Sequence, residues 1–317
     1  MKIVALDASH FNEGDIDWSP IKSLGSLVIH HATPDNLIIK RALDADIILT
    51  NKVVLNAETL SSLSNLKMIA VMATGYNNID IEAASKNGVV VSNIKDYSTN
   101  FVAQHAFALM LELTNQCGLH GTSVASGEWN NDSGWSYWKT PLTELSDKTL
   151  GIIGFGSIGQ KVAKIAKGFD LKVIASHKHP ERDKMEGVTF HSLDNVLMNS
   201  DIISLHCPLN KDNFGFINAK SIKQMKKTAI LINTSRGPLI NQSDLAEALK
   251  NKAIAGAGLD VLSQEPPSNN NPLIGIPNCI VTPHIAWASY ESRKRLMNIL
   301  ADNIKAFKKG NPKNVIT

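Results

Sequence analysis

The stretch Leu150-Gly151-Ile152-Ile153-Gly154-Phe155-Gly156-Ser157-Ile158-Gly159 decides the expected fold. Its apolar start predicts a strand, and the Gly-x-Gly-x-x-Gly spacing that follows predicts a tight turn into a helix. Gly154 permits the turn, Gly156 lets backbone approach a pyrophosphate, and Gly159 lets the helix pack close to its strand. The start of that helix also offers free N–H groups to an anion. The pattern favours a dinucleotide-binding site over a plain strand–turn–helix.

The composition is that of an ordinary globular protein. The chain has 317 residues, 43% hydrophobic and 19% charged, with a formal net charge of +3. This length allows two domains, and the small charge argues against nucleic-acid binding. No apolar run reaches the length of a membrane span, and the N-terminus does not resemble a signal peptide. Cys117, Cys207 and Cys279 are too widely spaced for a disulfide framework or a metal cluster, so we expect a cytoplasmic protein without metal.

Short apolar runs alternate with helical patterns along the chain, which favours α/β architecture with parallel sheets. The expected strands form two sets. The first set is Ile3–Leu6, Leu27–Ile29, Ile47–Leu49, Met68–Met72 and Val89–Val91; the second is Leu150–Ile153, Lys172–Ala175, Ile202–Leu205, Ala229–Ile232, Ala255–Gly258 and Cys279–Thr282.

The two sets resemble each other in sequence. Ala45–Leu49 parallels Ser200–Ser204, and Met68–Thr74 parallels Thr228–Thr234. We therefore expect two doubly wound domains of related topology, Rossmann-like or flavodoxin-like. The loops that follow the second pair are then equivalent loops at the carboxyl ends of strands, the edge at which open α/β sheets bind ligands.

A helix is expected over Ser98–Gln116, between the two sets of strands, because apolar residues recur there at helical spacing. The segment Gly127–Pro141 that follows is rich in tryptophan and long for a connection. We expect Trp129, Trp135 and Trp138 to cover a subunit contact, with a role at the rim of the active site as the alternative.

Three charged residues stand just beyond strand ends of the second set. They are Arg236, Glu265 and His284. Each alone is typical of a surface or structural position. Together, downstream of the glycine pattern, they indicate one catalytic set at the edge where such sheets bind ligands.

Six motifs, in order along nearly the whole chain, resemble those of a known family. They are Ala73–Asp80, Gly154–Gly159, Leu205–Leu209, Asn233–Gly237, Gly258–Val261 with Glu265-Pro266, and Thr282–Ala286. By these residues the chain resembles the D-isomer-specific 2-hydroxyacid dehydrogenases. Within that family, Trp135–Leu145 and His284–Ser289 look most like glycerate dehydrogenases, also called hydroxypyruvate reductases.

The resemblance implies an NAD(P)-dependent oxidoreductase that acts on the CH–OH group of D-2-hydroxy acids. We expect it to reduce hydroxypyruvate or glyoxylate to D-glycerate or glycolate. The alternatives are a dehydrogenase for lactate-type or branched 2-keto acids, and a dinucleotide-sensing protein of the corepressor kind.

The resemblance also implies roles for the charged set. His284 would protonate the carbonyl oxygen, and Glu265 would orient the ring and favour its charged form. Arg236 would hold the substrate carboxylate with its guanidinium fork. Further substrate contacts are expected at Lys52, Thr74, Gly75 and Tyr76.

Cofactor contacts follow from the same resemblance. Ser157 and Ile158 are placed at the pyrophosphate, and Thr234, Asp260 and Ala286 near the nicotinamide. The full set is Gly154, Gly156, Ser157, Ile158, Gly159, His177, Lys178, Cys207, Pro208, Thr234, Ser235, Asp260 and Ala286.

The choice between NAD and NADP depends on the end of the second strand after the glycine pattern. NAD-preferring sites usually carry an acid there, to bind the ribose 2′-hydroxyl. The stretch here is Ala175-Ser176-His177-Lys178-His179, followed by Arg182, and it contains no acid. Ser176, His177 and Lys178 could accept a 2′-phosphate, so either cofactor is expected, with a slight inclination to NADP.

The expected domains are a substrate domain at residues 1–98 plus 287–317 and a dinucleotide-binding domain at residues 99–286. The active site is expected in the cleft between them. The resemblance implies a homodimer, with a small 2-keto acid as substrate and neither nucleic acid nor membrane as partner.

Overall fold

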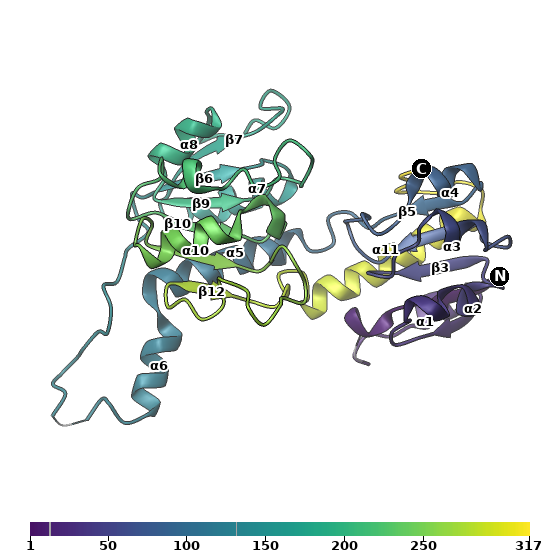
Figure 1. Ribbon diagram of the computed structural model, residues 1–317, viewed down its shortest axis with the longest axis horizontal. Coiled ribbons are helices and arrows are strands. Elements are labelled where there is room, and N and C mark those ends of the chain that lie inside the picture. The colour runs from purple at the N-terminus through teal and green to yellow at the C-terminus, as the bar shows by residue number, and fades with distance from the viewer. Residues whose placement is uncertain (13, 131) are drawn as a thin grey trace. The chain divides into compact units, whose positions relative to one another are not determined.

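The computed structural model describes residues 1–12, 14–130 and 132–317, and its chain divides into two compact units (Figure 1). Unit 1 comprises Met1–Ser98 and Trp287–Thr317, and unit 2 comprises Thr99–Ala286. Each unit is a parallel sheet with buried apolar clusters formed by helices on both of its faces. The expected architecture of two doubly wound parallel-sheet domains is therefore confirmed.

Unit 1 is a five-stranded sheet in the order β2-β1-β3-β4-β5, the flavodoxin-like order. Its central strands β3 and β4 are buried at every position, which explains their unbroken apolar sequences. The strands are β1 Lys2–Ala5, β2 Ser26–Ile29, β3 Ile47–Thr50, β4 Met68–Val71 and β5 Val90–Ser92. The helices are α1 Ser19–Lys22, α2 Ile38–Ala42, α3 Ala57–Ser61, α4 Ile81–Lys86 and α11 Tyr290–Lys308, with short 3-10 turns at Ala8–His10 and Asp35–Leu37.

Unit 2 is a seven-stranded sheet in the order β12-β11-β10-β9-β6-β7-β8. Its first six strands in chain order follow the Rossmann order 3-2-1-4-5-6. The strands are β6 Thr149–Ile153, β7 Lys172–Ser176, β8 Val188–Phe190, β9 Ile202–Leu205, β10 Ile230–Asn233, β11 Gly256–Leu259 and β12 Cys279–Val281. The helices are α5 Thr99–Asn115, α6 Cys117–Ala125, α7 Ser157–Lys167, α8 Leu193–Asn199, α9 Ala219–Ile222 and α10 Gln242–Lys250, with a 3-10 turn at Gly237–Leu239.

Two aspartates close the amino ends of the sheets in the same way. Asp46 accepts the backbone N–H of the first residue of β1 at 2.8 Å and pairs with Lys67 at 2.7 Å. Asp201 accepts the backbone N–H of the first residue of β6 at 2.9 Å and pairs with Lys226 at 2.8 Å. The sequence parallel between the two sets of strands is therefore a structural equivalence, and the loops after β4 and β10 correspond.

Each sheet also has a point at which the strand order reverses. In unit 1 it lies between β1 and β3, and in unit 2 between β6 and β9. Ligands of open α/β sheets bind outside the carboxyl ends of the strands at such points. The fold thus offers one candidate site in each unit.

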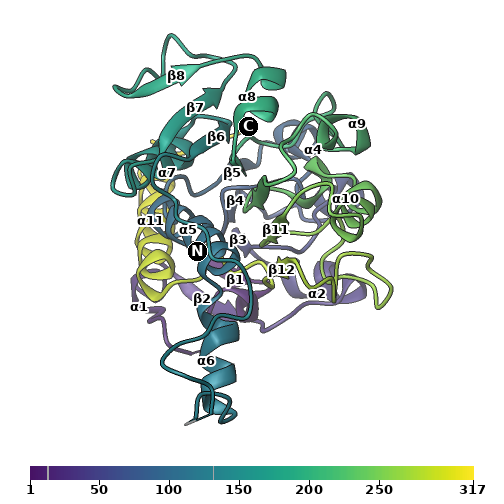
Figure 2. The same ribbon diagram turned by 90° about the vertical axis from the view of Figure 1, so that its left-hand side faces the viewer.

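Helix α6 and the segment after it extend away from the rest of unit 2 (Figures 1 and 2). Asn131 of this segment lies outside the described residues. The side chains of Trp129, Trp135 and Trp138 are 54%, 92% and 69% exposed. Such a concentration of exposed aromatic surface is typical of an interaction site.

Within the described residues, no helix combines the length and the apolar character needed to cross a bilayer. Cys117, Cys207 and Cys279 are all free thiols. Nowhere in the described parts of the chain do three or more metal-binding His, Cys, Asp or Glu side chains come together.

Candidate active site

The glycine turn of unit 2 lies at the point where its strand order reverses. Gly154 has φ +94°, and a Cβ there would lie 2.4 Å from the backbone nitrogen of Cys207. Only glycine allows β6 and the chain after β9 to approach so closely. A Cβ on Gly159 would lie 2.3 Å from the Gly154 carbonyl oxygen, whereas nothing lies within 4 Å of the Cβ position at Gly156. Gly154 and Gly159 are therefore packed tightly against neighbouring backbone, whereas the turn is open on the side of Gly156.

The open side of the turn presents backbone donors. Ser157, Ile158 and Gly159 open α7, an 11-residue helix, so their N–H groups have no partner inside the helix. The helix dipole adds a positive end at the same place. The turn fits a pyrophosphate, and it satisfies the requirement for a dinucleotide site.

The end of β7 holds a hydrogen-bond network that the sequence does not reveal. The Phe155 N–H donates to Nδ1 of His177 at 3.1 Å, and Nε2 of His177 lies 2.7 Å from Asp183. Because Nδ1 accepts a bond, Nε2 carries the proton and the ring is neutral. Arg182 donates to Asp183 at 2.6 Å. That hydrogen bond is the main reason why the pKa of Asp183 is lowered to about 2.

This network alters the interpretation of the β7 end. The segment of residues 175–179 contains no acid, yet the following loop brings the carboxylate of Asp183 against His177. Asp183 could not be predicted from the usual position of the acid at the strand end, because it lies seven residues beyond the end of β7. Lys178, the other residue expected to contact the cofactor here, is exposed.

Two further residues expected near the cofactor lie beside the carboxyl ends of β9 and β10. Cys207 is half-buried after β9, and burial raises the pKa of its thiol to about 11. Thr234 follows β10, and its hydroxyl is buried with no hydrogen-bond partner among the described residues. A buried hydroxyl without a partner costs free energy, which fits a group that hydrogen-bonds to a ligand. Pro208 is exposed, and Ser235 is tied down by its hydroxyl, which donates to the Leu205 carbonyl at 2.9 Å.

The histidine of the candidate catalytic set is paired with its carboxylate. Nδ1 of His284 lies 2.6 Å from Oε2 of Glu265, and Oε1 of Glu265 accepts the Leu262 N–H at 3.0 Å. His284 has φ +55°, a left-handed conformation that is uncommon outside glycine. Strain of this kind is typical of functional positions. The pairing fixes Nδ1 as the nitrogen that faces the carboxylate.

Asp260 holds the backbone on either side of His284. It is 1% exposed, and it accepts the Thr282 hydroxyl at 2.6 Å, the Ile285 N–H at 2.9 Å and the Ala286 N–H at 2.8 Å. Burial acts to raise its pKa, but these bonds and one from His105 outweigh burial, so the pKa is lowered. The carboxylate is an anchor for the His284 loop. Its expected contact with the nicotinamide remains a prediction.

The loop of Arg236 touches the loop of Glu265. A Cβ on Gly237 would lie 2.0 Å from the carbonyl carbon of Leu262, so glycine alone permits this approach. Arg236 itself is half-buried, and Asn233 at the end of β10 donates to its carbonyl at 2.9 Å. The structure thus brings the segments of the catalytic set together at the carboxyl edge of unit 2.

Unit 1 offers a second group of backbone donors, in the loop after β4. The Thr74 hydroxyl donates to the Ile94 carbonyl and the Asn93 amide donates to the Thr74 carbonyl, both at 2.7 Å. The N–H groups of Thr74, Gly75 and Tyr76 donate to no other residue in the described parts of the chain. A fixed loop with successive free N–H groups is a carboxylate-binding feature. Lys52 follows β3 on the same edge, with its side chain exposed.

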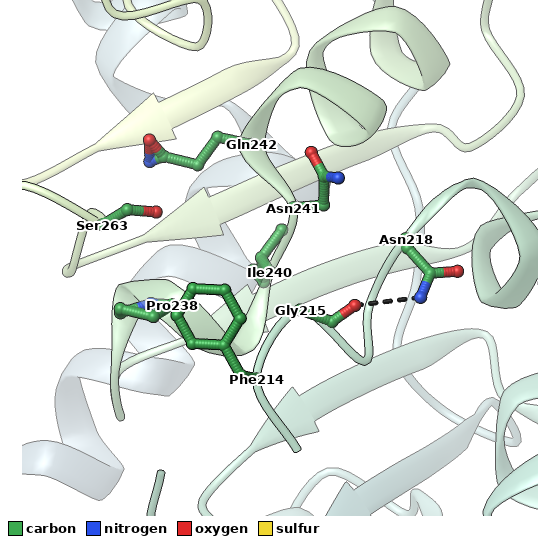
Figure 3. Close-up of a pocket in the computed structure, with 8 residues that line it drawn as sticks. All are labelled: Phe214, Gly215, Asn218, Pro238, Ile240, Asn241, Gln242 and Ser263. Atoms are coloured by element: carbon green, nitrogen blue, oxygen red, sulfur yellow. Dashed lines mark hydrogen bonds between the residues drawn. The ribbon is translucent and has the colours of Figure 1, made fainter. Parts of the chain in front are cut away.

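A separate hollow of about 460 Å³ lies on unit 2 beside the Gly237–Leu239 turn (Figure 3). Aromatic, aliphatic, amide and hydroxyl groups line it, and none of the lining side chains is titratable. The lining residues are Phe214, Gly215, Asn218, Pro238, Ile240, Asn241, Gln242 and Ser263. None of them belongs to the expected catalytic set, and the hollow lacks the groups needed for proton transfer.

The glycine turn and the His–Glu pair, on sheets of this order, define a class of protein, the nicotinamide-dependent dehydrogenases. Residues 107–286 match the family described as "D-isomer specific 2-hydroxyacid dehydrogenase, NAD binding domain". The chain belongs to the D-isomer-specific 2-hydroxyacid dehydrogenases, as its motifs predicted. It is an oxidoreductase with a nicotinamide dinucleotide cofactor.

Three similar proteins cover most of the chain. A hydroxypyruvate reductase of Blautia hydrogenotrophica is 44% identical, over 100% of this chain and 99% of its own. A glycerate dehydrogenase of Methylorubrum extorquens is 42% identical, over 90% of this chain and 89% of its own. Among solved structures, an acyclic imino acid reductase (Bsp5) in complex with NADPH and D-Arg has a TM-score of 0.89 at 34% identity, with 100% of both chains covered.

Proposed function

We propose that this protein reduces hydroxypyruvate to D-glycerate, and glyoxylate to glycolate, at the expense of a reduced nicotinamide dinucleotide. The observation that carries the proposal is the 2.6 Å pair of His284 and Glu265, together with the direct contact between the loop of Glu265 and the loop of Arg236. The names of the two most similar enzymes described above support this substrate class. The cofactor, when bound, supplies the hydride; the chain supplies orientation, charge and a proton.

In the proposed reaction, His284 donates the proton. As hydride reaches the carbonyl carbon, the electron pair of the C=O bond moves to oxygen, and the imidazolium releases its Nε2 proton to that oxygen. Glu265 faces Nδ1, so its negative charge stabilises the imidazolium before transfer and holds the ring in position. The product hydroxyl thus gains one proton, and the ring is left neutral.

Arg236 is proposed to bind the substrate carboxylate. A guanidinium presents two parallel N–H donors that match the two carboxylate oxygens, and it keeps its charge at every relevant pH. We assign a second set of carboxylate contacts to the free N–H groups of Thr74, Gly75 and Tyr76. Lys52 is proposed to contact the substrate as well.

A substrate panel tests the proposed activity. The panel contains hydroxypyruvate, glyoxylate, pyruvate and a branched 2-keto acid, and the absorbance of the reduced cofactor reports each reaction. We expect hydroxypyruvate to give the highest kcat/KM. An imine formed from a keto acid and an amine belongs in the panel because one similar structure is an imino acid reductase. A tenfold advantage for another substrate would reassign the enzyme, and inactivity toward all of them would favour a dinucleotide-sensing protein.

We further propose that NADH is preferred over NADPH. The sequence alone inclined slightly to NADP, through Ser176, His177 and Lys178. Against that inclination, both ring nitrogens of His177 are engaged and the ring is neutral, so it offers no charge to a 2′-phosphate. The charged carboxylate of Asp183 would instead repel a 2′-phosphate and accept a hydrogen bond from a ribose 2′-hydroxyl.

The preference is tested with Asp183→Asn. A hydrogen bond to a charged group contributes about 1.5–3 kcal/mol, so the kcat/KM ratio of NADPH to NADH should rise about 10-fold to 100-fold. Glu181→Gln is the matched control, because Glu181 lies in the same loop but, among the residues that the structure describes, pairs only with exposed Lys184. Its ratio should stay within about twofold of wild type. A wild-type enzyme that favours NADPH tenfold would contradict the proposal.

We also propose that the protein is a homodimer whose two-fold contact includes α6 and the segment Gly127–Pro141. The exposed side chains of Trp135 and Trp138, with Leu142 at 56% exposure, would then be covered by the second copy. Light scattering after size exclusion should give twice the chain mass, and Trp135→Ser with Trp138→Ser should shift it toward the mass of one chain. A wild-type monomer at micromolar concentration would exclude the dimer.

A further inference from the structure

Asp7 is a buried carboxylate at the point of unit 1 where the strand order reverses. It follows β1, and it is 2% exposed. Its oxygens accept the N–H groups of Asn51 at 2.9 Å, Lys52 at 2.5 Å and Val53 at 3.1 Å. No ion pair to this carboxylate is formed by the described residues. Asp7 is thus surrounded by the backbone of one loop, the loop that follows β3.

The arrangement does not favour stability by itself. Removal of a carboxylate from water costs free energy that backbone donors offset only in part when no cation is near. Burial raises the pKa of Asp7 in spite of the three N–H donors. A raised pKa means that this group's contribution to stability is present at low pH and is lost as the pH rises through the folded-state pKa. Once the pH exceeds that pKa, the charged form of Asp7 therefore works against folding.

The loop that Asp7 holds leads to the other proposed substrate contacts of unit 1. The Asn51 amide donates to the Met72 carbonyl at 3.3 Å, and the Asn78 amide donates to the Val53 carbonyl at 2.9 Å. Met72 and Asn78 flank the loop of Thr74–Tyr76. Asp7 is therefore linked by hydrogen bonds to both segments of unit 1 that lie at the ligand-binding edge of the sheet.

We propose that Asp7 is a positioning residue for substrate binding, which fixes the backbone of Asn51–Val53 and thereby the position of Lys52. Three consecutive N–H groups aimed at one carboxylate leave this loop a single conformation. The inference rests on the proposed function, since Lys52 is taken to contact the keto acid. A residue that lowers the stability of the folded state and orders a binding loop is typical of a functional position.

The first test is Asp7→Asn, which keeps the shape but turns one acceptor into a donor that faces an N–H group. The KM for hydroxypyruvate at saturating NADH should rise about tenfold, with the KM for NADH within twofold of wild type. A purely structural Asp7 would leave the KM for hydroxypyruvate unchanged, whatever the melting temperature, and that result would overturn the inference.

Asp46→Asn is the matched control. Asp46 also accepts a backbone N–H in this sheet, at 2.8 Å, but at the amino end, and it pairs with Lys67. Its replacement should lower the melting temperature and leave the KM for hydroxypyruvate within twofold of wild type. If both variants raise the KM equally, the position of Asp7 has no special role.

A double-mutant cycle tests whether Asp7 acts through Lys52. If it does, Lys52→Ala alone raises the KM for hydroxypyruvate, and Asp7→Asn added to it raises the KM no further than about twofold. Increases that multiply would mean that the two residues act independently and would refute the proposed route. Asp7→Ser replaces Asp7→Asn in the cycle if the amide variant does not fold.

Amide hydrogen exchange separates this inference from the proposed function. If the wild-type protein reduces no keto acid, the proposed function fails, but the anchoring of the loop can still be measured. The N–H groups of Asn51–Val53 should exchange at least tenfold faster in Asp7→Asn than in wild type, with other amides unchanged. Equal exchange in the two proteins would show that Asp7 does not order the loop.

Discussion

Replacement of Gly237 by alanine is the sharpest perturbation that the site allows, because it adds one methyl group between the two loops that carry the proposed catalytic residues Arg236 and Glu265. The new Cβ would lie 2.0 Å from the carbonyl carbon of Leu262, whereas ordinary contact begins at 3.4 Å. The loops of Arg236 and Glu265 must then separate by about 1.4 Å. A misplacement of about 1 Å can cost about 100-fold in rate, so kcat should fall by about that factor.

The same substitution has a separate effect on stability. Overpacking of this kind costs about 1–3 kcal/mol, which corresponds to a melting temperature several degrees lower. Gly168→Ala is the control, since it lies outside the proposed dimer contact and the nearest neighbour of its new Cβ is the Ile165 carbonyl oxygen, at 3.3 Å. Steady-state kinetics and thermal unfolding of both variants give the comparison. A Gly237→Ala enzyme with kcat within twofold of wild type would refute the contact between the two loops.

Three further predictions concern single side chains. His284→Ala should lower kcat at least about 100-fold, while fluorescence titration gives an unchanged Kd for NADH. Arg236→Lys should raise the KM for hydroxypyruvate about tenfold, because the fork geometry is lost; equal, small losses in these two variants would contradict their roles. Iodoacetamide at pH 8 should label exposed Cys117 first by mass spectrometry, because burial raises the pKa of Cys207 to about 11 and of Cys279 to about 12. Labelling of Cys207 should accelerate as the pH rises toward 11.

Most strands could be predicted because the central strands of both parallel sheets are buried and therefore apolar, and because the edge strand β2, although largely exposed, is also a short apolar run. The exception is β8, Val188–Phe190. It is an edge strand of three residues with an exposed centre, and such a strand has too little apolar surface to stand out. The four- and five-residue helices α1 to α3 also escaped prediction, because they are too short to repeat a helical period.

Site residues that act within one turn could be predicted from the sequence, whereas those that depend on partners from other segments could not. Gly154, Gly156 and Gly159 could be read from spacing, because each acts within one turn. The hydrogen-bond partners of Asp7 and Asp183 could not be predicted in this way. Asp7 takes its partners 44 to 46 residues away, and Asp183 reaches His177 from a surface loop whose path the sequence does not determine.

The paired aspartates at the amino ends of the two sheets have a consequence for how such an enzyme can change. Asp46 and Asp201 secure the strand starts, whereas Lys52, Arg236 and His284 all follow strand ends. The residues that secure the fold and those proposed to bind the substrate therefore lie at opposite ends of the strands. Replacement of the loops at the carboxyl ends of the strands by those of a relative with another substrate should therefore change substrate selectivity without disturbing the hydrogen bonds and ion pairs of Asp46 and Asp201.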